Sequence, residues 1–301
     1  MYDQDSKGIS YMAGFFMLLA FTIAGLVMAT AISDALWTQA TGRSLQTLTE
    51  TGLDPAHKNV YRLVQVITAV VGYLLPALVT AYLLNRKPLR LLGVTQGFSF
   101  SQASLSIIIL ASALFVATGF SYITTIFPYP ESWIEQFDLM EKQYSDQMSA
   151  TLSLEEPTDL ILAIIVMAVF PAIGEEVFFR GGLQNFLSRG TGRPWLAIVV
   201  TSILFSLAHF SFYGFLSRVV LGITLGALFH YSGRLWVSIF AHFLNNALLI
   251  VLLYVYMHQG KTVSEMMLES KGNLLGLVAI PVLIVLLAAF KKVSTPKGAN
   301  P

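Results

Sequence analysis

Three ionisable side chains stand inside an apolar stretch that is as long as a membrane helix. Glu175, Glu176 and Arg180 lie in the second half of residues 159–187. Glu176 and Arg180 are four residues apart and share a helix face, whereas Glu175 points about 100° away from its neighbour. One glutamate can therefore be paired while the other stays free for chemistry. Because charges at membrane depth are costly and usually functional, we expect a functional site here; the alternative is an ion-pair network that only holds helices together.

Histidine and asparagine side chains lie in two later apolar segments. His209 follows Phe205 by four residues, and His242 precedes Asn246 by the same spacing. With a rise of about 1.5 Å per residue, Glu175 and His209 each lie roughly 20 Å from the inner membrane surface, Asn246 roughly 16 Å and His242 roughly 10 Å. These depths are close enough for one cavity to be lined by all four side chains.

These residue types fit the hydrolysis of an amide by water. A carboxylate that is withdrawn from water is a stronger base, so Glu175 could take a proton from a water molecule that His209 helps to hold. His242 and Asn246 could donate hydrogen bonds to the negative oxygen of a tetrahedral intermediate, worth roughly 3–4 kcal/mol per donor. Each residue alone is also common as an interhelical hydrogen-bonding group, so the coincidence in depth carries the prediction.

The composition predicts that this site belongs to a polytopic membrane protein. Of 301 residues, 55% are hydrophobic and 12% are charged, and the mean hydropathy is +0.68; soluble domains have about 25% charged residues. The net charge of +1 is nearly neutral and gives no reason to expect the concentrated basic face of a nucleic-acid-binding protein. We therefore exclude nucleic acid as a partner. The absence of cysteine excludes disulfides, thiolate nucleophiles and Cys-ligated metals.

Apolar runs predict an all-α bundle of about eight transmembrane spans. The expected spans are residues 9–32, 60–84, 101–127, 159–187, 195–212, 216–231, 235–257 and 274–290. The first should be retained, although Ala29-Thr30-Ala31 resembles a signal-peptide cleavage site. In the fourth span, Pro171 should leave the carbonyl of Met167 without its helical donor. In the sixth, Gly222 and Gly226 should let two helices approach closely.

We expect an integral protein of a bacterial plasma membrane, and the distribution of basic residues predicts that both termini lie in the cytoplasm. Eleven of the eighteen Lys and Arg residues then lie inside: Lys7, Arg86, Lys87, Arg90, Arg180, Arg189, Arg193, Arg234, Lys291, Lys292 and Lys297. Residues 131–156 lie outside, with seven acidic residues and a helical stripe from Trp133 to Met148. We expect an amphipathic helix on the outer membrane surface; the alternative is a lid or substrate-docking helix.

The polar residues form three motifs that occur in a fixed order on successive spans. The motifs are Glu175-Glu176-x-x-x-Arg180, Phe205-x-x-x-His209 and His242-x-x-x-Asn246. Over roughly residues 161–249 the chain resembles the CPBP family of intramembrane endopeptidases. This family includes CAAX prenyl proteases and bacteriocin-processing or immunity-associated (Abi-type) membrane proteases.

The resemblance implies a role for each motif residue. Glu175 would be the general base, His209 would help to position the water, and His242 with Asn246 would form the oxyanion hole. Three further residues would support this site: Glu176, Arg180 and Phe205. The implied substrate is a peptide or membrane protein in the lipid bilayer. The glutamate mechanism requires no cofactor, but the family has been described both as metal-dependent and as glutamate proteases, so the resemblance leaves zinc possible.

The chain is thus expected to have four parts. Residues 1–127 form three N-terminal spans, 128–157 an acidic extracytoplasmic loop, 158–257 the CPBP-like catalytic core, and 258–301 the last span and a basic cytoplasmic tail. The fourth to seventh spans should enclose a polar cavity. Because Arg180, Arg189 and Arg193 gather at the inner end of the fourth span, we expect the cavity to open to the cytoplasm.

Two other functions fit the same residues. Glu175, His209 and His242 could supply the three ligands of a catalytic zinc site in a membrane metalloprotease. Polar groups near the membrane midplane and a Pro-interrupted helix also occur in transporters, and a non-catalytic scaffold is a related alternative. A transporter would be expected to show corresponding broken helices in two halves of the chain.

Overall fold

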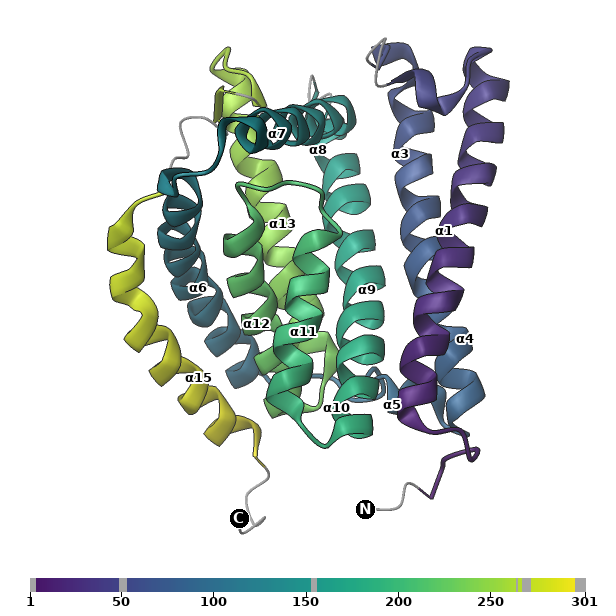
Figure 1. Ribbon diagram of the computed structural model, residues 1–301, viewed down its shortest axis with the longest axis vertical. Coiled ribbons are helices and arrows are strands. Elements are labelled where there is room, and N and C mark those ends of the chain that lie inside the picture. The colour runs from purple at the N-terminus through teal and green to yellow at the C-terminus, as the bar shows by residue number, and fades with distance from the viewer. Residues whose placement is uncertain (1–3, 49–52, 153–155, 264, 267–271, 296–301) are drawn as a thin grey trace.

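The computed structural model describes residues 4–48, 53–152, 156–263, 265–266 and 272–295, which are largely helical (Figure 1). Within these ranges there is no β-strand, only an isolated bridge between Ser6 and Asn85. The predicted all-α class is therefore confirmed.

Seven helices of the described residues are long and apolar enough to cross a membrane. Four are continuous: α1 (Tyr11–Thr41), α6 (Phe100–Ile126), α12 (Phe215–Ser232) and α13 (Leu235–His258). Many outward-facing side chains on these helices are apolar, as on α1, where Phe16 and Val27 are 62% and 67% exposed. Such a surface suits lipid, which confirms a polytopic membrane bundle.

The other three long helices contain turns of different geometry. The first, Lys58–Leu84, comprises α3 (Lys58–Ile67), the π-helical η3 (Thr68–Leu74) and α4 (Leu75–Leu84). The second, Pro157–Thr191, comprises α8 (Pro157–Ile164), the π-helical η4 (Ile165–Val169), α9 (Phe170–Glu176), the π-helical η5 (Val177–Gln184) and α10 (Asn185–Thr191). The third, Leu274–Ser294, comprises the 3-10 helix η6 (Leu274–Ala279) and α15 (Ile280–Ser294).

The predicted fifth span, residues 195–212, is wrong in length. Its helix, α11 (Pro194–Leu207), has 14 residues and rises only about 21 Å, which is short of the roughly 30 Å hydrocarbon core. The chain turns after Leu207, and Phe210 takes a left-handed φ of 50°, which a helix cannot contain. His209 therefore lies in a loop, residues 208–214, and not on a helix.

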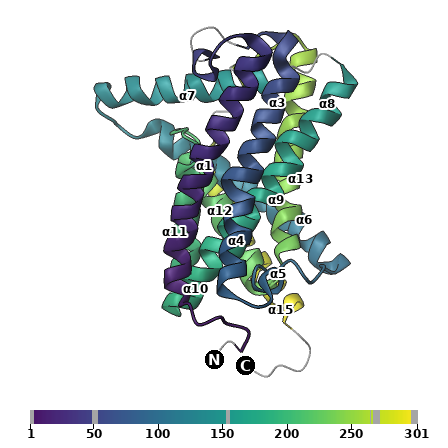
Figure 2. The same cartoon turned by 90° about the vertical axis from the view of Figure 1, so that its right-hand side faces the viewer.

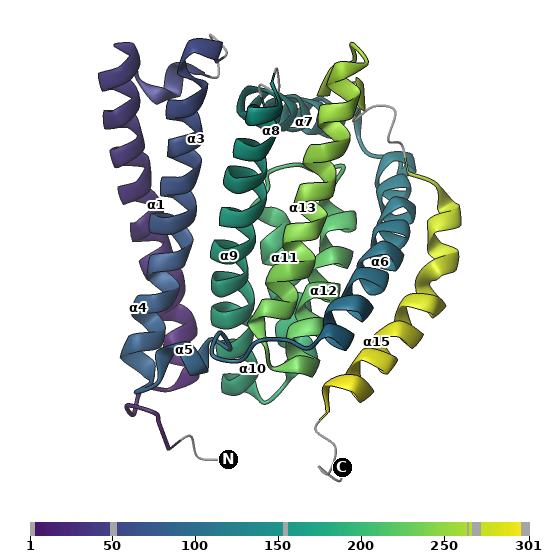
Figure 3. The ribbon, with the colours of Figure 1, turned by 180° about the vertical axis from the view of Figure 1, so that it is seen from behind.

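The bundle has three groups of helices side by side (Figures 1 and 3). α1 packs against η3 and α4 on one flank, and α6 packs against η6 and α15 on the other. Between them stand the long helix that contains α9, and α11, α12 and α13. Both described chain ends lie at one end of the bundle. Short elements complete the chain: η1 (Leu45–Thr47), η2 (Pro55–His57) and α5 (Pro88–Leu91).

The predicted amphipathic helix is present as α7 (Glu131–Leu152). It lies across the end of the bundle opposite the termini, at a steep angle to the long helices (Figures 1 and 2). Its apolar stripe rests partly on protein: the Phe137 ring stacks on that of Phe212 with centroids 3.5 Å apart, and Met148 packs against a cluster that contains Ile250 and Leu253. These contacts favour the lid alternative over a helix that only rests on lipid.

Candidate active site

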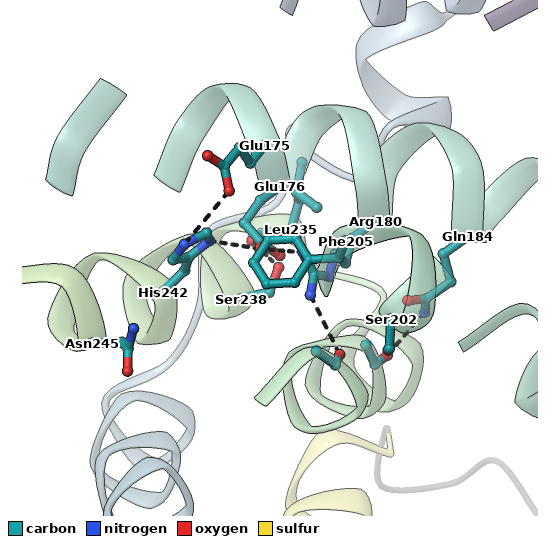
Figure 4. Close-up of polar contacts among 12 residues, drawn as sticks. Glu175, Glu176, Arg180, Gln184, Ser202, Phe205, Leu235, Ser238, His242 and Asn245 are labelled. Carbon is teal, nitrogen blue, oxygen red and sulfur yellow. Dashed lines mark hydrogen bonds and ion pairs between the residues drawn. The ribbon is translucent and has the colours of Figure 1, made fainter. Parts of the chain in front are cut away.

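Glu176 is the centre of a buried polar cluster (Figure 4). Its Oε1 atom accepts a hydrogen bond from Nη1 of Arg180 at 2.7 Å and lies 2.8 Å from Nδ1 of His242. None of the three side chains is more than 4% exposed. The predicted pair of Glu176 and Arg180 is confirmed, and it compensates a charge that would be very costly if it were buried alone.

Arg180 and the residue one turn later tie this helix to α12. Nη2 of Arg180 lies 3.4 Å from the carbonyl oxygen of Gly222, and Nε2 of Gln184 donates to the carbonyl of Gly226 at 2.9 Å. A Cβ atom at Gly226 would lie 2.6 Å from Oε1 of Gln184. The predicted close approach at Gly222 and Gly226 is confirmed. The Arg180 guanidinium also lies over the ring of Phe205, 4.5 Å from its centroid.

Glu175 has a different environment from its neighbour. Its side chain is 21% exposed, and its Oε2 atom lies 3.9 Å from Nε2 of His242. That oxygen has no hydrogen-bond partner among the described residues. The sequence predicted one paired and one free glutamate, and the structure assigns the free one to Glu175.

The contacts of His242 determine which ring nitrogen carries hydrogen. A carboxylate that pairs with Arg180 is ionised and can only accept, so Nδ1 of His242 donates to Glu176. In the neutral ring Nε2 then has a lone pair, on the side of Glu175. Neutral His242 therefore cannot donate to an oxyanion through Nε2. The oxyanion role implied for His242 requires the protonated ring.

His209 is fixed in a similar way. Its Nδ1 atom lies 2.8 Å from the backbone carbonyl oxygen of Phe205; a carbonyl only accepts, so Nδ1 carries the hydrogen. Its Nε2 atom is again left with a lone pair in the neutral ring. The Phe205 ring packs against the rings of His209 and His242, with centroids 4.8 Å and 5.7 Å apart. The spacing of four between Phe205 and His209 thus orients the histidine although α11 has ended.

Asn246 lies at the break in the neighbouring long helix. Pro171 has no N–H to donate to the carbonyl of Met167, and the π-helical η4 contains this carbonyl. Nδ2 of Asn246 lies 3.4 Å from that oxygen, and Oδ1 of Asn246 accepts from Nδ2 of Asn245 at 3.1 Å. The predicted unpaired carbonyl at Met167 is thus partnered by a site residue. One N–H of the Asn246 amide remains for a ligand.

Two cavities border the site and share part of their walls. The larger, about 440 Å³, lies between α6, α12 and α13, and His242 lines it. The smaller, about 320 Å³, lies between η3, α9 and α13, and Glu175 lines it. His209, Asn246 and Tyr144 line both. The four residues predicted to be catalytic are therefore brought together around one polar region of the bundle.

The cavities lie away from the arginines that were expected to mark their opening. Most residues that line the two cavities come from the half of the bundle under α7, which is the end away from the termini. Arg180, which was expected to mark the entrance, is 1% exposed and sealed by its ion pair. Arg189 and Arg193 line neither cavity. Buried ion pairing rather than an entrance accounts for the arginine in the fourth span.

α7 is anchored to the loop of residues 208–214, which contains His209. The Tyr213 hydroxyl donates to Oδ1 of Asp138 at 2.7 Å, and the Ser211 hydroxyl donates to Oε2 of Glu141 at 2.8 Å. Burial, together with the hydrogen bond to Asp138, raises the pKa of Tyr213 to about 12. Two acidic residues of the outer segment, Asp138 and Glu141, therefore have specific partners, which the sequence did not indicate.

Sequence reasoning did not identify Tyr144 and Asn245 as residues of the site. Tyr144 belongs to the apolar stripe of α7, and burial raises the pKa of its hydroxyl. Its place in both cavity walls follows from the crossing of α7, for which the sequence has no signal. Asn245 lines the larger cavity. The only sequence signal for this residue was its position next to Asn246 in the motif.

The residue types of this site suit a zinc ion, but their arrangement does not form a recognisable metal site. The lone pairs of Nε2 in His209 and His242 and the Glu175 carboxylate are the donor types that zinc prefers, and each imidazole donates its other N–H to an oxygen, as in zinc sites. However, the described residues contain no group of three or more His, Asp or Glu side chains arranged to hold a metal ion. The zinc site stays a prediction.

Comparisons with known proteins match the segment that contains this site. Residues 157–248 match the family of type II CAAX prenyl endopeptidase Rce1-like proteins. Over 91 residues the chain is 30% identical to the "Putative membrane peptidase YdiL" of Bacillus subtilis (strain 168), which is 30% of this chain and 37% of that protein. The chain thus covers little more than a third of that relative. No solved structure gives a significant match. The matched residues contain all three motifs, so the predicted family resemblance is confirmed.

Proposed function

We propose that this chain, a polytopic membrane protein of the CPBP family, is an intramembrane endopeptidase that hydrolyses peptide bonds with water activated by Glu175. The observation that carries this proposal is the contrast between two adjacent glutamates. Glu176 is fully buried and holds Arg180 and His242 through Oε1, although its Oε2 has no partner among the described residues. Glu175 is 21% exposed, lies no closer than 3.9 Å to His242, and faces a cavity that His209 and Asn246 also line. A free carboxylate beside a polar cavity suits a general base.

In the proposed first step, a water molecule binds between Glu175 and His209. The Glu175 carboxylate and Nε2 of His209 both accept, so the two hydrogens of the water are held and its oxygen lone pair is free to attack. The oxygen forms a bond to the carbonyl carbon of the peptide, and Glu175 takes the proton. Asn246 donates its remaining N–H to the negative oxygen of the tetrahedral intermediate.

In the second step the carbon–nitrogen bond breaks and the leaving nitrogen takes a proton. That proton comes from Glu175, either directly or through Nε2 of His242, 3.9 Å from the Glu175 carboxylate. The imidazolium that forms transiently is stabilised by Glu176, as an aspartate stabilises the histidine of a serine-protease triad. In its protonated form His242 could also donate to the oxyanion. The products are a carboxylate and an amine.

We also propose that the protein lies in a bacterial plasma membrane with both termini in the cytoplasm. Lys and Arg are in excess at the end of the bundle where the chain begins and where α15 ends. This excess supports the proposed orientation. α7 and the cavities beneath it would then lie on the outer side. Peptides or membrane proteins would reach Glu175 from that side or from the bilayer.

The function is tested by comparing membrane and secreted peptides of cells that produce the unaltered protein, Glu175→Gln or Glu135→Gln. Glu135 is exposed on α7 and lines neither cavity, so its variant is the matched control. We expect specific cleavage products to disappear with Glu175→Gln and to persist with Glu135→Gln. Identical peptide sets for all three proteins would contradict a peptidase that depends on Glu175.

Zinc-dependent hydrolysis is the second candidate mechanism, and the lone pairs of Nε2 in His209 and His242 favour it. Purified protein would be assayed on a substrate found in the peptide comparison, before and after treatment with a chelator, and again after zinc is added. The glutamate mechanism predicts unchanged turnover in all three samples. Loss with the chelator and recovery with zinc would favour the metal.

A further inference from the structure

Arg218 carries the only permanent charge among the described residues that line the larger cavity. No aspartate or glutamate lines that cavity, and no carboxylate of the described chain forms an ion pair with Arg218. Most of the remaining wall is apolar, with leucines from α6, α12 and α13. A cation in such surroundings is costly unless an anion compensates it.

The Arg218 side chain is held in place by contacts with the loop of residues 208–214 and with α7. One Nη2–H donates to the backbone carbonyl of Ser211, and the guanidinium lies 5.7 Å from the centroid of the Tyr144 ring. Gly214 leaves room for it, because a Cβ atom there would lie 2.3 Å from Nη1 of Arg218. The Nε atom is buried and has no hydrogen-bond partner among the described residues. An unsatisfied donor on a fixed guanidinium indicates that an acceptor is missing.

The chemistry of the cavity indicates what kind of acceptor this is. A guanidinium offers a planar pair of N–H donors that matches a carboxylate, and the leucine wall suits apolar side chains. His209 and Asn246 line this cavity and also the cavity of Glu175. A peptide bound against Arg218 would therefore extend toward the site where we place the hydrolysis.

We propose that Arg218 is a specificity residue that binds a carboxylate of an apolar peptide segment lying in the larger cavity. The carboxylate is either the C-terminus of the peptide or an acidic side chain. This inference rests on the proposed peptidase function for the identity of the ligand. Its test is a binding measurement, which does not require cleavage.

Three fluorescent probes distinguish the two sources of a carboxylate. They are a dansylated tetraleucine peptide as the free acid, the same peptide as the C-terminal amide, and the amide with one internal glutamate. Binding is measured on the full chain in detergent. The free acid, the glutamate peptide or both should bind at least about tenfold more tightly than the neutral amide, because a charge-assisted hydrogen bond is lost with the amide.

Variants assign the preference to Arg218. Arg218→Gln should abolish the difference between charged and neutral peptides, and Arg218→Lys should keep part of it because a point charge remains. Arg193→Gln, at an exposed arginine outside both cavities, should keep all of it. Glu141→Gln should not weaken binding of the acid. The negative charge of Glu141 acts on Arg218 and would repel a bound carboxylate, so its removal cannot cost affinity. A loss with Glu141→Gln equal to that with Arg218→Gln would show that Arg218 only anchors α7.

The proposal is overturned if the unaltered protein binds neither charged peptide better than the neutral amide, or if the preference survives in Arg218→Gln. Sodium oleate is a further probe: Arg218-dependent binding of oleate with no preference for a charged peptide would assign the cavity to a lipid. If Arg218→Gln does not fold, Arg218→Lys and the three peptides on the unaltered protein decide. An Arg218-dependent preference together with full cleavage by Glu175→Gln would remove the proposed hydrolysis and leave the binding site.

Discussion

The two halves of the site differ in how their polar groups are satisfied. On the side of the chain termini, Glu176, Arg180 and His242 are at most 4% exposed and form a closed set of short contacts. On the side of α7, Glu175 and His209 border cavities, and the covering helix is held by contacts such as those of Asp138 and Glu141. The first half is a rigid support, and the second has room for a ligand.

This difference explains how two adjacent glutamates can have opposite roles. Consecutive residues of a helix point about 100° apart, so Glu176 faces the packed interface with α12 and α13 while Glu175 faces a cavity. The Glu176 carboxylate orients His242 by accepting a hydrogen bond from Nδ1. The Glu175 carboxylate lies 3.9 Å from Nε2 of the same ring. Mutations in the closed half should therefore act on stability, and mutations in the open half on function.

The largest effect is expected from Glu176→Gln, which leaves Arg180 buried without a carboxylate. Uncompensated burial of a guanidinium costs roughly 3–5 kcal/mol, and the variant also weakens the acceptor of His242. We expect a large fall in melting temperature in detergent. Arg180→Ala should resemble it, and the double variant should lose less than the sum of the two. An unchanged melting temperature for Glu176→Gln would show that the pair is not a structural support.

The second prediction concerns Glu175→Gln, which keeps the shape of the side chain but cannot take a proton from water. Turnover should fall by at least ~10²-fold, whereas the melting temperature should stay close to that of the unaltered protein. Cleavage of a substrate and thermal unfolding would be measured on the same samples. Normal cleavage by Glu175→Gln, combined with a well-folded but inactive Glu176→Gln, would reverse the roles of the two glutamates.

The sequence predicted those features that depend on local spacing. Long apolar runs placed most spans within a few residues of their helices, and the spacing of four predicted the pair of Glu176 and Arg180. The fifth span failed because the residues around Phe210 remain apolar through the turn, so hydropathy gives no end to the helix. His209 lies in a loop because α11 ends at Leu207, and the apolar composition of this segment does not show that end.

Features that depend on the packing of helices were not predictable. The contact of His242 with Glu176 joins residues that are 66 positions apart. Rise per residue alone put His242 roughly 10 Å shallower than Glu175, although the two side chains lie 3.9 Å apart. Arg180 was read as a sign of a cytoplasmic entrance because its burial could not be seen. The crossing of α7 over the cavities depends on partners such as Tyr213 and Ser211, which carry no motif.

A third prediction tests on which side the open half is reached. The chain has no cysteine, so single cysteines can be introduced without background. Ser217→Cys lines the larger cavity, whereas Ser238→Cys replaces a fully buried residue beside Glu176. A charged thiol reagent added outside intact cells should label position 217 at least about tenfold faster than position 238, because charged reagents do not cross lipid. Equal labelling, or labelling of position 217 only after the cells are opened, would contradict an outward-facing cavity.

The smallest effect is expected at the contact between α7 and the His209 loop. Tyr213→Phe removes the hydrogen bond to Asp138 but keeps the ring. The variant should lose no more than about 1 kcal/mol of unfolding free energy, which is seen as a small fall in melting temperature.

The sign of the pH dependence of this effect follows from the pKa of Tyr213, which burial and Asp138 raise from 10.0 to about 12. The folded protein holds the proton more tightly than the unfolded chain, so the contribution is present below about pH 10 and is lost as the pH rises toward 12. Melting temperatures of Tyr213→Phe and the unaltered protein should differ at pH 8 and converge as the pH approaches 12. Tyr82→Phe is a control, because the Tyr82 side chain is exposed and lies far from α7 in the chain. A difference between Tyr213→Phe and the unaltered protein that persists at high pH would show that the hydroxyl proton is not what anchors α7.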